Sequence, residues 1–353
     1  MKNLSVRVVT YNVADSGPPN DSLIDLVGVG DIDSRSDVIF VGLQEVENGD
    51  KWVERLKEIV TPYNYVLLKV RYCWKMWLAV FIQRNLLVAV TNIESETTAS
   101  GVGGILANKG GVSIRFELCG VNIIGVCAHM SAHTENLTDR IEDYVDIISN
   151  QSFRDPDVNS ILDHDYVIWF GDLNFRIDGI AKEEVERLIS EGKYSKLWDY
   201  DQLLLSRKAH RIFEQFEEGN LNFAPTFKFD IGTNNYDSSK KQRVPSWTDR
   251  VLFMAHTDFA LDHNVRLDSL GRRVSAVPRH LPVRGPPSEI DIQMRPADQS
   301  PKIELIEYRS IPSYTYSDHK PVYARLSLAI PEFWFSLPVH FLSPTGGSTQ
   351  FIS

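Results

Sequence analysis

The chain has 353 residues, enough for one large domain or two smaller ones. A hydrophobic share of 43% and a charged share of 24% are those of an ordinary globular protein with a sizeable core. The formal net charge of −10 argues against a protein that coats nucleic acid or anionic membrane by bulk attraction, so an anionic ligand must be met by local basic groups.

Apolar runs of strand length alternate with helical patterns along the chain. The predicted strands cover residues 6–13, 37–43, 65–70, 78–82, 86–90, 111–118, 121–128, 166–170, 251–254 and 322–328. One predicted helix runs through Trp52, Leu56 and Ile59 after a cap at Asp50, and others cover residues 137–148, 181–189 and 212–216. Many strands with few helices predict sheets packed on each other with helices outside.

Residues 274–301 differ in composition from the rest, with six prolines, several arginines and the run RGPP. Such a segment is typical of a loop and is interpreted as an insertion. The three cysteines, Cys73, Cys119 and Cys127, lack metal-finger spacing and predict free thiols in a reducing compartment. The N-terminus is too polar for a signal peptide, and no run approaches the roughly 20 apolar residues of a membrane span. We therefore expect a monomeric cytoplasmic protein, peripheral to membranes.

Short polar clusters follow the apolar runs. They are TYN at Thr10–Asn12, QE at Gln44–Glu45, AHMSAH at Ala128–His133, GDLNFR at Gly171–Arg176, PSWTDR at Pro245–Arg250 and SDH at Ser317–His319. Carboxylate and amide oxygens suit a hard cation such as Mg²⁺, whereas imidazoles and basic side chains suit a phosphate. These clusters are spread along the whole chain, as expected when the C-terminal ends of several strands meet at one crevice. The pattern predicts a metal-dependent phosphoester hydrolase.

The GDLNFR cluster supplies the candidate general base. Gly171 lets the chain turn after a buried run, so that Asp172 and Asn174 point into the same site. The alternative interpretation is an Asx turn at the end of a strand, for which Gly-Asp is common. Asp172 is the candidate base for an attacking water, and Asn174 would hold that water or a phosphate oxygen. The Asp249 carboxylate can fix the tautomer of His319 and favour its cation.

His129 and His133 have a spacing that also fits zinc on a helix, but no HExxH glutamate lies between them. Core histidines are a second interpretation. Contact with a phosphate is the one that we favour.

GDLNFR and PSWTDR resemble the two signature motifs of the inositol polyphosphate 5-phosphatases, a branch of the DNase I-like superfamily. The order of the other clusters is similar too, including ANKGG at Ala107–Gly111 and SDHKPV at Ser317–Val322. The resemblance covers roughly residues 5–328. It implies an α/β fold, a four-layer α/β/β/α sandwich, with the site at one end of its two sheets. We expect one catalytic domain over residues 1–330, with the insertion at 274–301, and a tail over 331–353.

The resemblance also implies roles for individual residues. Glu45 would be the ligand of a Mg²⁺ cofactor, supported by Asn12. His129 and His319 would contact the scissile phosphate, with Asp249 orienting His319. Asp318 would help to position the site.

Substrate recognition is predicted from a basic segment. Between Lys228 and Arg250 there are five basic and three acidic residues, within a chain that is acidic overall. Lys228, Lys241 and Arg243 match family positions that grip the phosphate beside the one cleaved, and Lys109 is a second phosphate contact. The remaining predicted substrate-binding residues are Asn108, His133, Arg176 and Arg250. The chain departs from the family at Phe227, where tyrosine is frequent and its hydroxyl contacts the neighbouring phosphate.

The predicted reaction is Mg²⁺-dependent hydrolysis of the 5-phosphate of phosphoinositides, such as phosphatidylinositol 4,5-bisphosphate and 3,4,5-trisphosphate, or of soluble inositol polyphosphates. The cluster Tyr72, Trp74, Met76 and Trp77 is predicted either to touch lipid acyl chains or to pack in the core. The competing functions are a phosphodiesterase or nuclease on the same scaffold and a non-catalytic phosphoinositide-binding domain. No nucleic-acid partner is expected.

Overall fold

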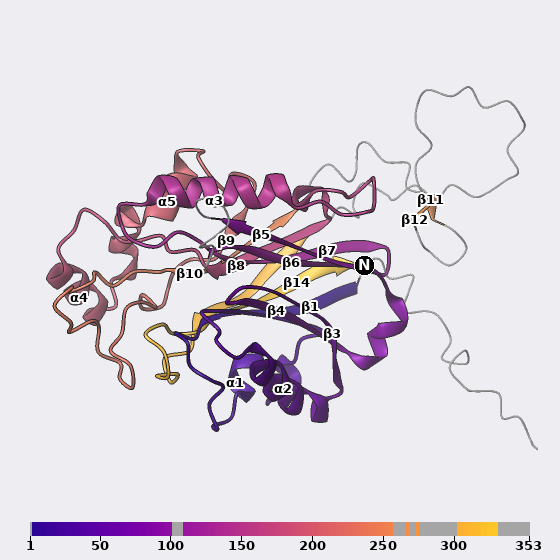
Figure 1. Cartoon of the computed structure of the whole chain (residues 1–353), viewed down its shortest axis with the longest axis horizontal. Coiled ribbons are helices and arrows are strands. Elements are labelled where there is room, and N and C mark those ends of the chain that lie inside the picture. Colours follow the sequence, from indigo (N-terminus) through magenta and orange to yellow (C-terminus); the bar gives the residue numbers. More distant parts are fainter. Residues whose placement is uncertain (1, 101–108, 257–265, 268–272, 275–301, 331–353) are drawn as a thin grey trace, which may run out of the picture.

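The computed structural model describes residues 2–100, 109–256, 266–267, 273–274 and 302–330. Two six-stranded sheets pack face to face and carry helices on their outer faces (Figure 1). The first sheet has the order β13 (Ile303–Ser310), β14 (Val322–Ile330), β1 (Lys2–Asn12), β2 (Val38–Gln44), β4 (Met76–Gln83) and β3 (Tyr65–Cys73). The second has the order β5 (Val90–Ser100), β6 (Lys109–Leu118), β7 (Val121–His129), β8 (Tyr166–Asp172), β10 (Asp249–Ala255) and β9 (Glu217–Glu218). The short strands β11 (Arg266–Leu267) and β12 (Arg273–Val274) pair separately.

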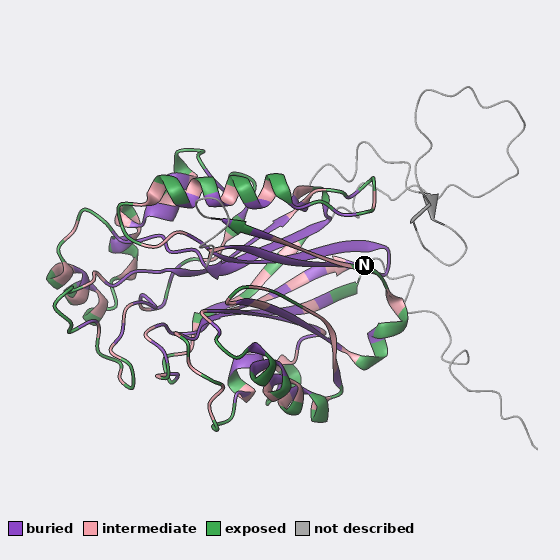
Figure 2. Cartoon of the chain, viewed as in Figure 1, coloured by how far each residue is buried: buried purple, intermediate pink, exposed green. Residues whose placement is uncertain are grey.

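Apolar side chains fill three layers. Between the sheets, Phe40 of the first sheet stacks on Phe116 of the second. The outer face of the first sheet is covered by α1 (Ile24–Val27) and α2 (Gly49–Val60), which buries Trp52. The outer face of the second is covered by α3 (Leu137–Asn150) and α5 (Gln202–Lys208), and the exposed sides of the helices face outward (Figure 2). The predicted four-layer α/β/β/α sandwich is confirmed.

Helix α4 (Lys182–Ser190) lies beyond the end of the sheets at which β1 finishes (Figure 1). Short 3-10 helices complete the chain at Ile32–Ser34, Thr61–Tyr63, Arg84–Ala89, Ile161–Asp163 and Tyr194–Tyr200. Among the described residues, no helix is long and apolar enough to cross a membrane.

Two parallel strand pairs bring the polar clusters to one end of the molecule. Strand β1 runs parallel to β2 and pairs Asn12 with Gln44, while β7 runs parallel to β8 and pairs His129 with Asp172. The antiparallel β10 begins at this end and pairs Asp249 with Asp172. Parallel strands end at the same edge of a sheet, so residues from distant clusters become neighbours.

Several predicted elements were wrong or missing. The apolar run at 86–90 forms the 3-10 helix Arg84–Ala89, and residues 212–216 form a turn, whereas α5 was not predicted. Helix α2 begins at Gly49 and not after Asp50, which lies in its first turn. Residues 275–301 of the predicted insertion and the predicted tail 331–353 lie outside the described residues.

Candidate active site

The backbone at the end of β8 determines where Asp172 lies. Gly171 has a φ of +146°, and a Cβ there would lie 1.9 Å from the carbonyl oxygen of Ala128. Only glycine therefore allows β8 to approach β7 this closely. The next residues are held by Leu173 N, which donates to Thr248 O at 2.7 Å, and by Met130 N, which donates to Asp172 O at 3.0 Å.

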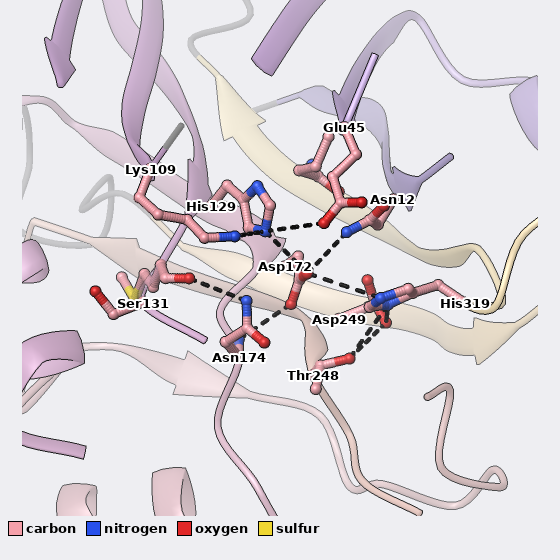
Figure 3. Close-up of polar contacts among 12 residues, drawn as sticks. Asn12, Glu45, Lys109, His129, Ser131, Asp172, Asn174, Thr248, Asp249 and His319 are labelled. Atoms are coloured by element: carbon pink, nitrogen blue, oxygen red, sulfur yellow. Dashed lines mark hydrogen bonds and ion pairs between the residues drawn. The ribbon is translucent and has the colours of Figure 1, made fainter. Parts of the chain in front are cut away.

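The Asp172 carboxylate is the centre of the site (Figure 3). Its Oδ2 accepts a hydrogen bond from Asn12 Nδ2 at 2.9 Å and lies 3.3 Å from His129 Nε2 and 3.9 Å from His319 Nε2. Its Oδ1 accepts from Asn174 N at 3.1 Å. Burial favours the neutral acid, but the charge of His319 and the contact with His129 outweigh it, so the pKa of Asp172 lies well below its usual range. Asp172 is therefore ionised.

Asp249 fixes the orientation of His319. The carboxylate Oδ2 lies 3.0 Å from His319 Nδ1 and also accepts from Thr226 Oγ1 at 2.7 Å and Thr248 Oγ1 at 2.9 Å. Burial would lower the pKa of His319, but the carboxylates of Asp249 and Asp172 raise it to about 9. His319 is thus an imidazolium at neutral pH whose Nε2 faces the site.

A second pair of basic residues, His129 and Lys109, also lies beside Asp172: His129 contacts the carboxylate, and Lys109 contacts His129. The Lys109 ammonium on β6 contacts His129 Nε2. Burial, and then the charge of Lys109, lower the pKa of His129, and burial lowers the pKa of Lys109. His129 is therefore a neutral imidazole beside an ionised carboxylate, in contrast to His319.

Two sets of residues can be considered for a metal ion. Among the residues that the structure describes, Asp172, Asp249 and His319 bring possible ligand atoms within 4.8 Å of one another. His319 is an imidazolium at neutral pH, and an imidazolium has no lone pair to offer a metal ion, so this set fits an ion poorly. Glu45, directly after β2, is 40% exposed and lies 3.8 Å from His129 Nε2. An accessible carboxylate next to the Asn12 amide offers the oxygen ligands that a hard cation prefers.

Asn12 mainly braces Asp172 in this arrangement. Its Nδ2 donates to the carboxylate, and its Oδ1 accepts from Ala14 N at 3.0 Å, which leaves one lone pair on that oxygen.

Basic side chains lie beside His319. Lys228 forms an ion pair with Asp318, and Arg176 donates from Nε to Asn174 O at 3.0 Å. Burial would raise the pKa of Asp318, but His319 and Lys228 lower it below its usual range. Lys241 is exposed, and Arg243 is half-buried, with its backbone N–H bonded to Asp237.

Comparison with known proteins identifies the family. Residues 9–325 match the family model described as Endonuclease/Exonuclease/phosphatase family 2. Inositol polyphosphate 5-phosphatase K of Mus musculus is 32% identical over 352 residues, which cover 97% of this chain and 69% of that protein. The chain belongs to the inositol polyphosphate 5-phosphatase family.

Two further matches agree with this family membership. Phosphatidylinositol 4,5-bisphosphate 5-phosphatase A of Rattus norvegicus is 36% identical over 336 residues, 92% of this chain and 31% of that protein. This chain thus spans about a third of that relative's length. The inositol polyphosphate 5-phosphatase domain of SPsynaptojanin, solved with inositol (1,4)-bisphosphate and calcium, superposes with a TM-score of 0.74 at 29% identity and covers 92% of this chain and 84% of that one.

The fold also occurs outside the phosphatases. The Cimex nitrophorin ferrous NO complex reaches a TM-score of 0.67 at 21% identity, covering 94% of this chain and 100% of that one. A likeness at this identity shows the shared fold alone.

One predicted substrate contact of this 5-phosphatase family member needs correction. Arg250 is fully buried, and its guanidinium bonds to both oxygens of Asp201 at 3.0 Å and to Glu218 at 2.6 and 2.8 Å. It also donates to Trp247 O at 3.3 Å. Because its donors are engaged inside the protein, Arg250 has a structural role and does not bind substrate.

Two other predicted substrate-binding residues are not placed at the site, and two residues that support it were not predicted. His133 is exposed, and Asn108 lies outside the described residues. Sequence reasoning missed Thr226, which holds Asp249, and Arg140, which is buried and donates to the carbonyls of Ser131 at 3.0 Å and His133 at 2.6 Å. Arg140 thereby holds the loop after His129. Its position in an amphipathic helix gave no signal of this, because arginine there usually faces solvent.

Proposed function

We propose that this protein is a Mg²⁺-dependent phosphatase that removes the 5-phosphate of phosphoinositides or soluble inositol polyphosphates by in-line attack of an activated water. The observation that carries the proposal is the pairing of an ionised, buried Asp172 with a cationic His319 whose Nε2 lies 3.9 Å away. Hydrolysis of a phosphate monoester requires a group that accepts the proton of the water. It also requires a neighbouring cation that stabilises the negative charge of the phosphate.

The attacking water would be held by Asp172 and Asn174. Asn174 has a left-handed φ of 57° and donates from Nδ2 to Met130 O at 2.9 Å, so its position is fixed by the backbone. Asp172 would orient the water and take its proton as the new oxygen–phosphorus bond forms. Its low pKa makes it a modest base, so orientation supplies much of the effect.

The charge of the scissile phosphate would be met by His319, Lys109 and Arg176. All three converge on the mouth around Asp172, and His319 carries its charge at neutral pH. Glu45, with Asn12 behind it, would hold the Mg²⁺ ion. When bound, such an ion neutralises phosphoryl charge and stabilises a developing alkoxide.

Selectivity for inositides would come from the neighbouring phosphate. Lys228, Lys241 and Arg243 belong to the segment beside His319 and would pair with a phosphate that does not itself react. Cations that pair with a second phosphate add no contact to a substrate that has only one. Their presence therefore supports an inositide substrate over a general phosphate ester.

Membrane contact is proposed at the turn between β3 and β4. Tyr72 and Trp74 are each 59% exposed, whereas Met76 is buried and Trp77 is half-buried. The turn adjoins the active-site mouth, because Lys75 O accepts from Val46 N, one residue after Glu45, at 2.9 Å. Two exposed aromatic side chains beside the mouth suit a lipid interface.

Phosphate release from a substrate panel tests the proposal. The panel contains vesicles with phosphatidylinositol 4,5-bisphosphate, soluble inositol 1,4,5-trisphosphate, and matched compounds that lack the 5-phosphate. We expect release only from compounds with a 5-phosphate, loss of release in excess chelator, and recovery with Mg²⁺. Glu45→Gln should weaken the Mg²⁺ response because an anionic oxygen ligand is lost.

Other outcomes would contradict this function. Full activity in chelator would remove the metal from the reaction, and rescue by Zn²⁺ alone would point to the histidines as ligands. Cleavage of phosphodiesters at a comparable rate would favour the nuclease alternative. Binding of the panel without release would leave a non-catalytic binding domain.

A further inference from the structure

The ring of Phe227 lies among three basic side chains of the candidate site. Its centroid is 4.5 Å from that of the His319 imidazole, with the planes tilted by 38°. The Arg176 guanidinium carbon lies 4.5 Å from the ring centroid, over its face, and Lys228 Nζ lies 5.7 Å from it. These distances are within the range of cation–π attraction.

Backbone pairing places the ring there. Phe227 bridges to Ser246 on one side and to His319 on the other, both antiparallel. Residues directly opposite in such a pair project on the same face, so the side chains of Phe227 and His319 are neighbours by construction. The ring is only 7% exposed, so water does not screen its contacts strongly.

The buried cations His319 and Arg176, with the half-buried Lys228 beside them, need compensation that leaves them free to bind an anion. His319 is bonded to Asp249 and Lys228 to Asp318. Within the described part of the chain, Arg176 has no carboxylate oxygen within ion-pair distance, and it bonds to Asn174 oxygens. A further carboxylate would stabilise Arg176 but would also repel a phosphate. The negative face of an aromatic ring stabilises a cation without adding net charge.

We propose that Phe227 is a positioning residue: its ring holds the imidazolium of His319 and the guanidinium of Arg176 in place for the substrate phosphate. The inference rests on the proposed phosphatase function. It differs from the role implied by the family's frequent tyrosine, because it depends on the ring face and not on a hydroxyl.

A fluorination series tests the ring face without changing its size much. Phe227 is replaced by 4-fluoro-, 3,5-difluoro- and 3,4,5-trifluorophenylalanine, each of which makes the face less negative. We expect kcat/KM for phosphate release to fall stepwise with fluorine number, reaching about tenfold to thirtyfold. The kcat/KM of Phe227→Leu, which removes the ring, should fall at least as far.

The control position is Phe116, which is buried in the inter-sheet core and stacks on Phe40. The same fluorinated residues at Phe116 should leave kcat/KM unchanged, and thermal unfolding checks that every variant is folded. A flat kcat/KM across folded Phe227 variants, or an equal fall at Phe116, would overturn the inference.

A second measurement separates this inference from the proposed function. If the unsubstituted protein releases no phosphate from the panel, the function fails, and the inference is then judged by the NMR titration of His319. A face that stabilises the imidazolium predicts that the pKa of His319 falls along the fluorine series. In that case an unchanged pKa of His319 across the series overturns the inference and leaves Phe227 as core packing only.

Discussion

Replacing Arg250 with methionine should destabilise the fold far more than it impairs substrate binding. The change leaves two buried carboxylates, Asp201 and Glu218, without their shared cation. Glu218 keeps partial compensation from Arg207 at 3.4 Å and from the Tyr308 hydroxyl at 3.1 Å, so the loss falls mainly on Asp201. Removing one partner of a buried ion pair costs about 3–5 kcal/mol. An unfolding entropy of about 2.1 cal/mol/K per residue gives about 0.7 kcal/mol/K for 353 residues, so Tm should fall by about 4–7 °C.

Urea and thermal unfolding measure this loss, and the KM of the folded protein measures the effect on substrate binding. Arg243→Met is the matched control, since it removes the same group from a half-buried position in the basic segment: we expect nearly normal stability and a raised KM. Adding Asp201→Asn to Arg250→Met should recover part of the stability, because the stranded charge is removed. An Arg250→Met protein with unchanged unfolding but a raised KM would refute the structural role and restore Arg250 as a substrate contact.

Three further predictions concern the site. Asp172→Asn should lower kcat by about 10²–10⁴-fold in the phosphate-release assay, and near-normal turnover would remove Asp172 from the mechanism. Changing Lys241 and Arg243 to alanine should lower kcat/KM more for substrates with adjacent phosphates than for an isolated 5-phosphate, by about one to two decades per charged hydrogen bond lost, and equal losses would indicate a solvated loop. The pKa of His319 is raised to about 9 from 6.5, so its stabilising contribution is complete below pH 6.5 and is lost as pH rises through 9. The stability difference between the unsubstituted protein and His319→Gln should narrow across this window, and a constant difference would contradict the assignment.

The central strands could be predicted from sequence, and two edge strands could not. Strands β1, β2, β7 and β8 are buried on both faces and read as continuous apolar runs. Strand β5 is an edge strand, partly exposed and rich in threonine and glutamate, and β13 is another edge strand with alternating exposure. Charged and polar residues interrupt the apolar ones in both strands, so neither forms a continuous apolar run from which a strand is predicted.

The polar clusters predicted which segments reach the site but not which side chains enter it. Asp249 and Arg250 are consecutive in β10, and successive residues of a strand point to opposite faces. Asp249 points to His319, so Arg250 points away from it toward Asp201. The apolar residues that follow are buried on both faces, so the sequence offered no alternation from which to choose. Thr226 lies 23 residues before Asp249 and is brought to it only by tertiary pairing.

The site is the polar end of the core between the two sheets. This explains why side chains from residues far apart in the sequence point into the same space. Asn12, His129 and Asp172 each follow, two positions along their strand, a residue that lies between the sheets: Thr10, Cys127 and Phe170. Beneath the site, Gln44 links the sheets, since it accepts from Thr10 Oγ1 at 3.2 Å and donates to Cys127 Sγ at 3.2 Å. A slip of one residue in any of these strands would turn its functional side chain to the opposite face. The packing that sets the strand register, with Phe40 on Phe116 at its centre, is therefore also what aims the carboxylate, amide and imidazole at one another.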